Sequence, residues 1–588
     1  MDNFTNNSYD KRNKLFLAIV FSLSSFIMLF FIYNFLIAQV VYMSNGAIIT
    51  FPGLITWINH SNLAFNILSI VCNLILFSVI IPLVVLFVLY KVIYFVFFRK
   101  YFNEFSFILY RQSKLPEKLP KVLVVFPTYN DFMPDIVRRN ICQTYQNIEY
   151  YILDDSNDPD YIDMINQFVK EYPNVKVVRR TDRVGWKGGN IDHFLHSYQD
   201  DWNYYCICDA DVLIQNDFIE SNIALFYAGV AKIGYIQGVI SAYDSGWLTS
   251  TALRPKIEIK NEFTNFLSSG SCAHNYDSGI IISRTCYDDI GNIGDNVNCD
   301  TAFLIKAFEK GYRGIYSNLS FFTSMEPKNL PEYIRRDHRW IQAQFDILTD
   351  KNFKTKIHKS NQPLRVKLYM ETFLKSWINL PVVILLASIL YVVGYTCQYY
   401  LYDHLNWWNR EWTLFDCALV IFLCLIAFNI LSELYSLIVF RKRLVYLMYL
   451  IFAKRFAQYE SVMSLHTMLV CYIANLFNIH QKSFNTTNKY INGSGMNFRE
   501  NFQLLFWRIM FGLGFLVIAI TLLLVQIFCH IEILPIIIFF FINALPGIYC
   551  ILFGWFNQIR IKSKHFLDFD LFNPFNRIRE KYGFEKIK

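Results

Sequence analysis

Charged side chains are scarce in this chain of 588 residues. Asp, Glu, Lys and Arg make up 17% of it, whereas an ordinary soluble protein has about 25%. Hydrophobic residues account for 54% and aromatic residues for 18%. This balance indicates a membrane protein rather than a wholly soluble one.

Other common signatures are also missing. The 13 cysteines include no Cys-x-x-Cys pair and no Cys/His cluster at zinc spacing, which argues against a structural metal or a disulfide framework. No basic run with interleaved aromatic residues is present, so nucleic acid is not expected as a partner. The apolar run at 15–40 is longer than the core of a signal peptide and has no convincing cleavage site, so an uncleaved first span is predicted.

Long apolar runs are abundant, and about 20 such residues cross a bilayer. Basic clusters follow the second, fourth and sixth runs, which by the positive-inside rule puts both termini and the central region in the cytoplasm. We therefore predict a multi-pass protein of the plasma membrane, with the lipid bilayer as a partner. The six predicted spans are 15–38, 66–97, 373–396, 414–439, 505–528 and 532–556.

The segment 444–480 is apolar but is broken by Lys454, Arg455, Glu460 and His466. Counting it as a seventh span would invert the charge pattern of the loops that follow. Amphipathic helices at the cytoplasmic interface are the favoured interpretation. Whether residues 456–480 lie at the interface or cross the membrane stays open.

Between the second and third spans, residues 102–365 alternate short apolar runs with helical patterns. Helices are predicted at 133–145 and 161–171, between the strands. Such alternation is typical of a parallel α/β sheet, whose ligands bind at the carboxyl ends of its strands. The four predicted strands are 122–126, 150–153, 175–178 and 204–208.

Two carboxylates close the last of these strands in Asp209-Ala210-Asp211. In a strand, residues i and i+2 point to the same face, so both side chains are expected to emerge together. Oxygen ligands of this kind suit a divalent cation that carries a diphosphate. The alternative is a pair of solvated turn carboxylates.

Further polar motifs occur in a fixed order along the domain. Each one alone is explained by a turn, a helix cap or a solvated face, but the ordered set is harder to dismiss. The motifs are Pro127-Thr128-Tyr129-Asn130-Asp131, Asp154-Asp155-Ser156-Asn157, Lys187-Gly188-Gly189-Asn190, His274-Asn275, Asp300-Thr301 and Arg335-Arg336-Asp337-His338-Arg339-Trp340.

This set resembles the membrane-integrated family 2 glycosyltransferases, the processive synthases of cellulose, hyaluronan and related glycans. The likeness is greatest to the osmoregulated periplasmic glucan glucosyltransferases, whose final motif is Arg-x-x-Arg-Trp, as in Arg336, Arg339 and Trp340. Cellulose synthases carry Gln-x-x-Arg-Trp there. The resemblance implies binding of a UDP-sugar by Thr128, Tyr129, Asp131, Asp154, Asp155, Lys187, Asp209, Arg336 and Arg339.

The resemblance also implies roles in catalysis. Asp211, with Asp209, would ligate Mg²⁺ or Mn²⁺. Asp300 would be the base, although Asn298-Cys299-Asp300-Thr301 lacks the Glu of the usual Thr-Glu-Asp motif. The growing polysaccharide would be bound by Trp340, His274 and Asn275, while interface anchoring is the alternative role for Trp340.

A second likeness lies downstream, at Ser483 to Lys489. This segment resembles the Phe-x-Val-Thr-x-Lys gating loop of cellulose synthases, with Thr486 in place of Val. Phe484, Thr487 and Lys489 would then contact the nucleotide. A plain polar linker is the alternative.

The expected protein is an α-helical membrane protein with about six spans and interfacial helices, and with an inserted cytoplasmic α/β glycosyltransferase-A (Rossmann-like) domain. The expected activity is processive, inverting transfer of a hexose from a UDP-sugar, with UDP-glucose as first choice and a β-glucan as product. The alternatives are a non-processive transferase acting on a lipid-phosphate carrier and a transporter with a nucleotide-binding domain.

The sequence indicates no oligomeric state. The expected parts are a first hairpin (1–101), the catalytic domain (102–365), a second hairpin (366–440), interfacial helices with the gating loop (441–504), a third hairpin (505–556) and a basic tail (557–588) that packs on the catalytic domain or on the membrane surface.

Overall fold

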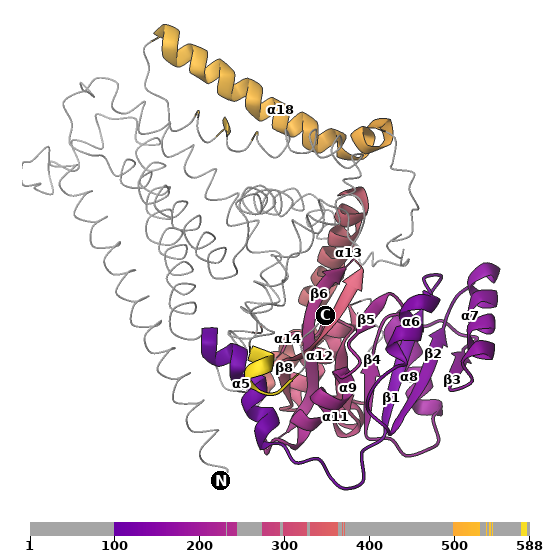
Figure 1. Ribbon diagram of the computed structural model, residues 1–588. Coiled ribbons are helices and arrows are strands. Elements are labelled where there is room, and N and C mark those ends of the chain that lie inside the picture. The colour runs from indigo at the N-terminus through magenta and orange to yellow at the C-terminus, as the bar shows by residue number, and fades with distance from the viewer. Residues whose placement is uncertain are drawn as a thin grey trace, which may run out of the picture. The chain divides into compact units, whose positions relative to one another are not determined.

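Figure 1 shows the fold of the protein as a computed structural model. The chain divides into two compact units, and the α/β domain predicted at 102–365 falls in the unit made of 99–378, 448–507 and 549–588. The other unit comprises 1–98, 379–447 and 508–548. The structure describes residues 99–230, 232–243, 273–293, 298–325, 330–360, 498–529 and 578–584, and single residues at 362, 367, 370, 537, 540, 541 and 544.

Strands and helices alternate through the first half of the domain, as predicted. All four predicted strands are present, as β1 to β4, and the two predicted helices between them are α6 and α7. In chain order the elements are α5 (Arg99–Gln112), β1 (Val122–Thr128), α6 (Pro134–Asn140), β2 (Ile148–Asp154), α7 (Pro159–Glu171), β3 (Val175–Arg179), α8 (Trp186–Ser197), β4 (Tyr204–Ile207), β5 (Val212–Ile214), α9 (Phe218–Ile223), η3 (Ala224–Tyr227), β6 (Ile233–Tyr243), β7 (Ile280–Ser283), α11 (Arg284–Ile290), α12 (Cys299–Glu309), β8 (Arg313–Met325), α13 (Leu330–Thr349), α14 (Lys351–Lys359) and α18 (Phe498–Cys529).

The eight strands form one sheet with the order β3-β2-β1-β4-β7-β6-β8-β5. The strands β3, β2, β1 and β4 are mutually parallel, which confirms the parallel arrangement predicted for this part. Beyond β4 the sheet becomes mixed, because β7 runs antiparallel to both β4 and β6, and β5 runs antiparallel to β8. The parallel half therefore collects the ends of β1, β2 and β4 at one edge.

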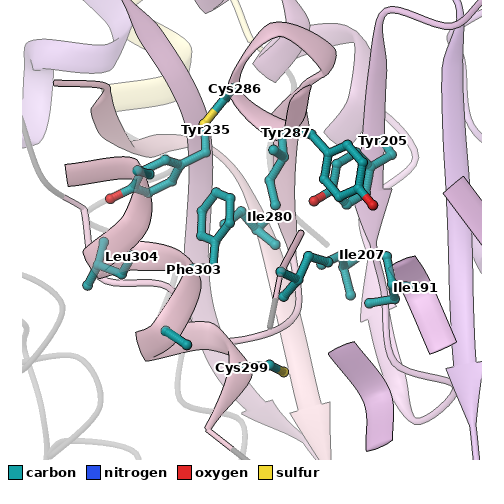
Figure 2. Close-up of a cluster of buried hydrophobic side chains, with 14 of the residues drawn as sticks. Ile191, Tyr205, Ile207, Tyr235, Ile280, Cys286, Tyr287, Cys299, Phe303 and Leu304 are labelled. Carbon is teal, nitrogen blue, oxygen red and sulfur yellow. The ribbon is translucent and has the colours of Figure 1, made fainter. Parts of the chain in front are cut away.

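Helices α8, α11 and α12 cover one face of the sheet, over a cluster of aromatic and aliphatic side chains (Figure 2). Tyr205 of β4 packs edge-on against Tyr287 of α11, and Phe303 of α12 packs against Tyr235 of β6. Cys299, the first residue of α12, is buried in the same cluster. This anchoring holds the start of α12 at the margin of the core.

The opposite face is covered by α6, α7 and α9. Along β1 the side chains alternate between the two faces: Leu123 and Val125 join the first cluster, whereas Val124 and Phe126 join the second. A strand that is apolar on both faces is expected for a parallel sheet with helices on either side. The continuous apolar run of β1 in the sequence has this cause.

The chain does not remain extended through Asp209 and Asp211, contrary to the expectation from their spacing. Strand β4 ends at Ile207, and a turn follows in which the amide of Val212 donates to the carbonyl of Asp209 at 2.9 Å. The amide of Asp209 donates to the hydroxyl of Ser278. The two carboxylates thus belong to a hydrogen-bonded turn between β4 and β5, in which Asp211 is buried.

The C-terminal segment 578–584 packs on the α/β domain, one of the two locations expected for the tail. Tyr582 stacks on Phe107 of α5 with ring centroids 5.1 Å apart. The buried guanidinium of Arg579 donates to Asp217, which precedes α9. The tail therefore ties α5 to the segment that follows β5.

One expected span, 505–528, lies within α18. In the part of the chain that the structure describes, we find no helix with both the length and the apolar character needed to cross a membrane. The first four expected spans, nearly all of the sixth, and the interfacial segment 444–480 lie outside the described residues.

Candidate active site

The first polar segment at the edge of the sheet is the turn after β1. One carboxylate oxygen of Asp131 accepts hydrogen bonds from the hydroxyl of Thr128, at 2.7 Å, and from the amide of Tyr129, at 2.8 Å. The guanidinium of Arg183 lies over the ring of Tyr129, 5.9 Å from its centroid. Asp131 thus shapes the turn that presents Tyr129.

The two carboxylates after β2 are each paired with an arginine at the end of β3. Asp154, whose side chain is fully buried, accepts from Nε of Arg179 at 2.7 Å. Asp155 accepts from Nε and Nη2 of Arg180 at 2.9 and 2.7 Å. Parallel pairing of β2 with β3 sets Asp154 opposite Arg179, so the adjacent residues meet as well.

The loop between β3 and α8 brings Lys187 to the site. Gly185 precedes α8 with a φ of +80°, a conformation that glycine adopts without steric cost. Asn190 donates from its side chain to the carbonyl of Leu153 on β2. This bond fixes the first turn of α8 against the sheet.

Lys187 lies between two carboxylates. Its Nζ is 2.5 Å from Oδ1 of Asp209 and 3.0 Å from Oδ2 of Asp277, and it donates to the carbonyl of Asp277 at 2.6 Å. Asp277 has a φ of +64°, the left-handed region that non-glycine residues seldom occupy. Strained backbone of this kind is frequent at functional sites.

The charges of this group perturb one another. Burial, followed by the repulsion of Asp277 and Asp211, raises the pKa of Asp209 to about 7, against the opposing pull of Lys187. Burial alone would lower the pKa of Lys187, but the carboxylates of Asp209 and Asp277 raise it above its usual value. The site therefore holds more negative charge than its lysine neutralises.

This excess of carboxylate fits a hard divalent cation. Asp209 and Asp211 sit on one short turn and supply only oxygen donors, which Mg²⁺ and Mn²⁺ accept. Within the described ranges, no group of three or more His, Cys, Asp or Glu side chains is placed to hold a metal ion. A cation here would need further oxygen ligands from a bound phosphate and from water.

Asp300 lies in the first turn of α12, next to this group. Its Oδ1 accepts from the amide of Thr301 at 2.6 Å. Burial, and then the negative charge of Asp277, raise the pKa of Asp300 to about 7. A carboxylate with such a pKa is suited to remove a proton near neutral pH.

His274 and Asn275 precede Asp277 and are both buried. Asn275 accepts from the amide of Asp277 at 2.8 Å and donates to the carbonyl of Asp300 at 3.3 Å. The ring of His274 packs edge-on against Tyr276. Asn275 thus joins the strained Asp277 to the start of α12.

The last motif lies on α13. The guanidinium of Arg336 lies 4.4 Å from the ring centroid of Trp340, and Trp340 is 43% exposed. Burial, and then the neighbouring charge of Arg336, lower the pKa of Arg339 to about 10. One further turn along, Gln344 accepts from the side chain of Asn298 at 2.8 Å.

The hydrogen bond between Gln344 and Asn298 ties α13 to the residue that precedes α12, and so to Asp300.

The sequence did not single out Gln344, Asp277 or Arg180. Asp277 follows the noted His274-Asn275 pair by two residues, and Arg180 closes the third predicted strand. Their partners, however, are remote in sequence. The predicted gating-loop residues Phe484, Thr487 and Lys489 lie outside the described residues.

Comparison with known proteins finds a family match within the described domain. The model of the family described as Glycosyl transferase family 2 matches residues 123–291. A probable glucomannan 4-beta-mannosyltransferase 3 from Oryza sativa subsp. japonica is 24% identical over 237 residues, which are 38% of this chain and 42% of that protein. Glucans biosynthesis glucosyltransferase H from Pseudomonas aeruginosa is 28% identical over 100 residues, 16% of this chain and 11% of that protein.

These matches span less than half the length of either relative.

Among solved structures, a mannosyltransferase from Pyrobaculum calidifontis, in complex with GDP-mannose and Mn²⁺, aligns with a TM-score of 0.43 and 14% identity. That alignment covers 70% of this chain and 99% of the other. The family match covers β1 to β7 and the residues Lys187, Asp209, Asp211 and Asp277. Residues 123–291 therefore match a glycosyl transferase family 2 domain.

Proposed function

We propose that the protein is a polysaccharide synthase of the plasma membrane. It transfers a hexose from a UDP-sugar, with UDP-glucose as first choice, to the end of a growing glycan, with inversion at the anomeric carbon. The product is a β-glucan that leaves through the spans of the same chain. The catalytic domain and both termini are cytoplasmic.

The group around Lys187 carries this proposal. A half-buried lysine between Asp209 and Asp277, with the buried Asp211 on the same turn as Asp209, offers one positive charge and several oxygen ligands. A diphosphate that carries a divalent cation needs both kinds of partner. A site for a purely neutral ligand would not need this number of charged side chains, which are removed from water to a large extent.

The reaction requires a base on the acceptor side. The acceptor hydroxyl oxygen attacks the anomeric carbon, its proton passes to the carboxylate of Asp300, and the bond from that carbon to the diphosphate breaks. Lys187, Arg336 and Arg339 meet the charge that develops on the departing UDP. A cation bound at Asp211 and Asp209 would act as a Lewis acid toward the same diphosphate.

The acceptor and the nucleotide are held from two sides. Trp340 exposes its ring for stacking on a sugar, with His274 and Asn275 beneath the acceptor. Tyr129, held by Asp131, lies next to Asp155 in the turn region that would meet the uracil and ribose. Phe484, Thr487 and Lys489 would close over the nucleotide. The membrane location rests on the six apolar runs and on the basic clusters that follow alternate runs.

Purified full-length protein in detergent tests the proposal directly. Incubation with radiolabelled UDP-glucose and Mn²⁺ is expected to produce a polymer that β-glucanase degrades. GDP-mannose and UDP-galactose serve as donor controls, because the rice relative is named as a mannosyltransferase. A single transferred sugar on a lipid extract would point to the non-processive alternative, and no transfer from any donor would refute the proposal.

A further inference from the structure

Arg180 occupies a place in the site that the proposed chemistry does not use. Its side chain is 4% exposed and lies between the end of β2 and the loop that leads into α8. We propose that Arg180 is a positioning residue of the donor site, which sets Lys187 by holding the loop at 184–186. This inference rests on the proposed function, because it assigns Lys187 to the diphosphate.

Arg180 is held in place by a pair of hydrogen bonds to Asp155. Nε and Nη2 of Arg180 donate to the two carboxylate oxygens of Asp155, at 2.9 and 2.7 Å, in the bidentate geometry that a planar guanidinium favours. The side chain of Asp155 is only 10% exposed. The pair orients the guanidinium rigidly, because neither partner has room to turn away.

The same guanidinium also contacts the loop that leads into α8. Nη1 of Arg180 donates to the carbonyl of Val184 at 2.7 Å, and Nη2 donates to the carbonyl of Trp186 at 2.8 Å. Between these carbonyls the backbone is left-handed at two successive residues, with φ of +80° at Gly185 and +47° at Trp186. Such a conformation persists only when its surroundings support it.

The loop is also confined from the side of α8. A Cβ atom on Gly189 would lie 2.1 Å from the carbonyl oxygen of Val184. That carbonyl is therefore enclosed between the Arg180 guanidinium and the backbone of α8. Only glycine at position 189 allows the loop to close this tightly.

The loop held by Arg180 ends one residue before Lys187, so its geometry also sets the position of Lys187. Trp186 is the first residue of α8 and Lys187 the second, so the direction of the Lys187 side chain follows from the loop geometry. Its Nζ meets Asp209 and Asp277 only with α8 in this position. Arg180 itself touches neither carboxylate of that group in any described contact, which makes it a positioning residue rather than a catalytic one.

The neighbouring Arg179 provides a matched control. Arg179 is the last residue of β3 and pairs with Asp154, the last residue of β2. Its other described hydrogen bond goes to Asn166 on α7, away from the loop. A general loss of stability would follow from weakening either pair. Loss of nucleotide binding should follow from Arg180 alone.

The experiment compares Arg180→Lys with Arg179→Lys in the full-length protein, with UDP and separately GDP, each with Mn²⁺, as probes. Lysine keeps the charge but cannot bridge Asp155 and two carbonyls, so we expect Arg180→Lys to weaken binding of the preferred nucleotide about tenfold in calorimetry. Arg179→Lys is expected to stay within about twofold, with a similar change in melting temperature. Unchanged affinity in Arg180→Lys would overturn the proposal.

A double-mutant cycle with Lys187→Met tests the route of the effect. If Arg180 acts through Lys187, Arg180→Lys should change affinity by less than about twofold once Lys187 is gone. Independent, multiplying effects would overturn the proposal. Gly189→Ala would displace the Val184 carbonyl and bring a methyl group 3.1 Å from Nη1 of Arg180, while leaving the Arg180 and Asp155 side chains in place. It is expected to reproduce the Arg180→Lys defect, and normal affinity there would also count against the proposal. If the unmodified protein binds neither nucleotide, the proposed function itself fails, and this inference with it.

Discussion

The carboxylates at the end of β2 and those in the group around Lys187 differ in how many positively charged side chains accompany them. Asp154 and Asp155 each meet an arginine of their own, and their hydrogen bonds hold loops in place. Asp209 and Asp277 share one lysine, while Asp300 lies beside them. The first group is compensated in charge, and the second is not.

This difference separates support from chemistry within one site. Where each carboxylate has its own arginine, the hydrogen-bonded pair serves as a fixed anchor. Where several carboxylates share one cation, burial and mutual repulsion raise the pKa values of Asp209 and Asp300 to about 7. Perturbed pKa values of this kind mark the groups that bind cations or move protons.

The largest expected effect is the loss of the base. Asp300→Asn keeps the shape of the side chain but cannot accept the acceptor proton, so we expect kcat to fall by about 10²–10⁴-fold. Affinity for UDP with Mn²⁺ should stay near the wild-type value, as measured by calorimetry. If nucleotide binding fell in parallel with kcat, Asp300 would be part of the nucleotide site around Lys187 and not the base that acts on the acceptor.

The next effect comes from removing the shared cation. Lys187→Met leaves Asp209 and Asp277 without their counter-charge, and we expect the binding free energy of the nucleotide to weaken by about 2–3 kcal/mol. Calorimetry with UDP and Mn²⁺ measures this change. Lys176→Met is the control, because Lys176 is exposed and pairs with Glu149 outside the site, and an equal loss there would remove the contrast between the two groups.

A smaller effect is expected on the pH dependence. Asp300 must be deprotonated to act, so kcat should rise with pH through about 7 in the wild type. Asp277→Asn removes a negative charge that raises the pKa of Asp300, so the acid limb should move to lower pH by about one unit. Asp288→Asn, on the exposed side of α11, should leave the profile unchanged, and a shift to higher pH in Asp277→Asn would contradict the assignment.

The smallest effect concerns the tail, whose pairing resembles the compensated group. Arg579 is buried and donates to Asp217 at 2.8 Å, so Arg579→Ala should lower the free energy of unfolding by about 1–2 kcal/mol with little change in kcat. Chemical denaturation of the purified protein measures the loss. Lys581→Ala removes an exposed pair with Glu104 and should matter much less. An equal loss from both would argue against a specific role for the buried pair.

The parallel half of the sheet could be predicted from sequence because apolar runs ending in polar residues leave a local signature. The runs at 122–126 and 204–208 became β1 and β4, and their ends meet at one edge as expected. The antiparallel strands β6 and β7 were not predicted, because an apolar run carries no record of its partner or direction. The turn at Asp209 and Asp211 was likewise read as strand, since alternation alone cannot show where a strand ends.

The sequence by itself determined which chemical groups are present and in what order: the Asp209/Asp211 pair, Lys187 before it, Asp300 after it, and Arg336, Arg339 and Trp340 last. Those follow from local pattern and residue chemistry. The tertiary structure alone decided which charges are compensated, because the pairing of Asp155 with Arg180, and of Lys187 with both Asp209 and Asp277, joins residues from separate elements. Electrostatic energy depends on distances in space, so residues 90 positions apart, such as Lys187 and Asp277, interact only once the chain is folded.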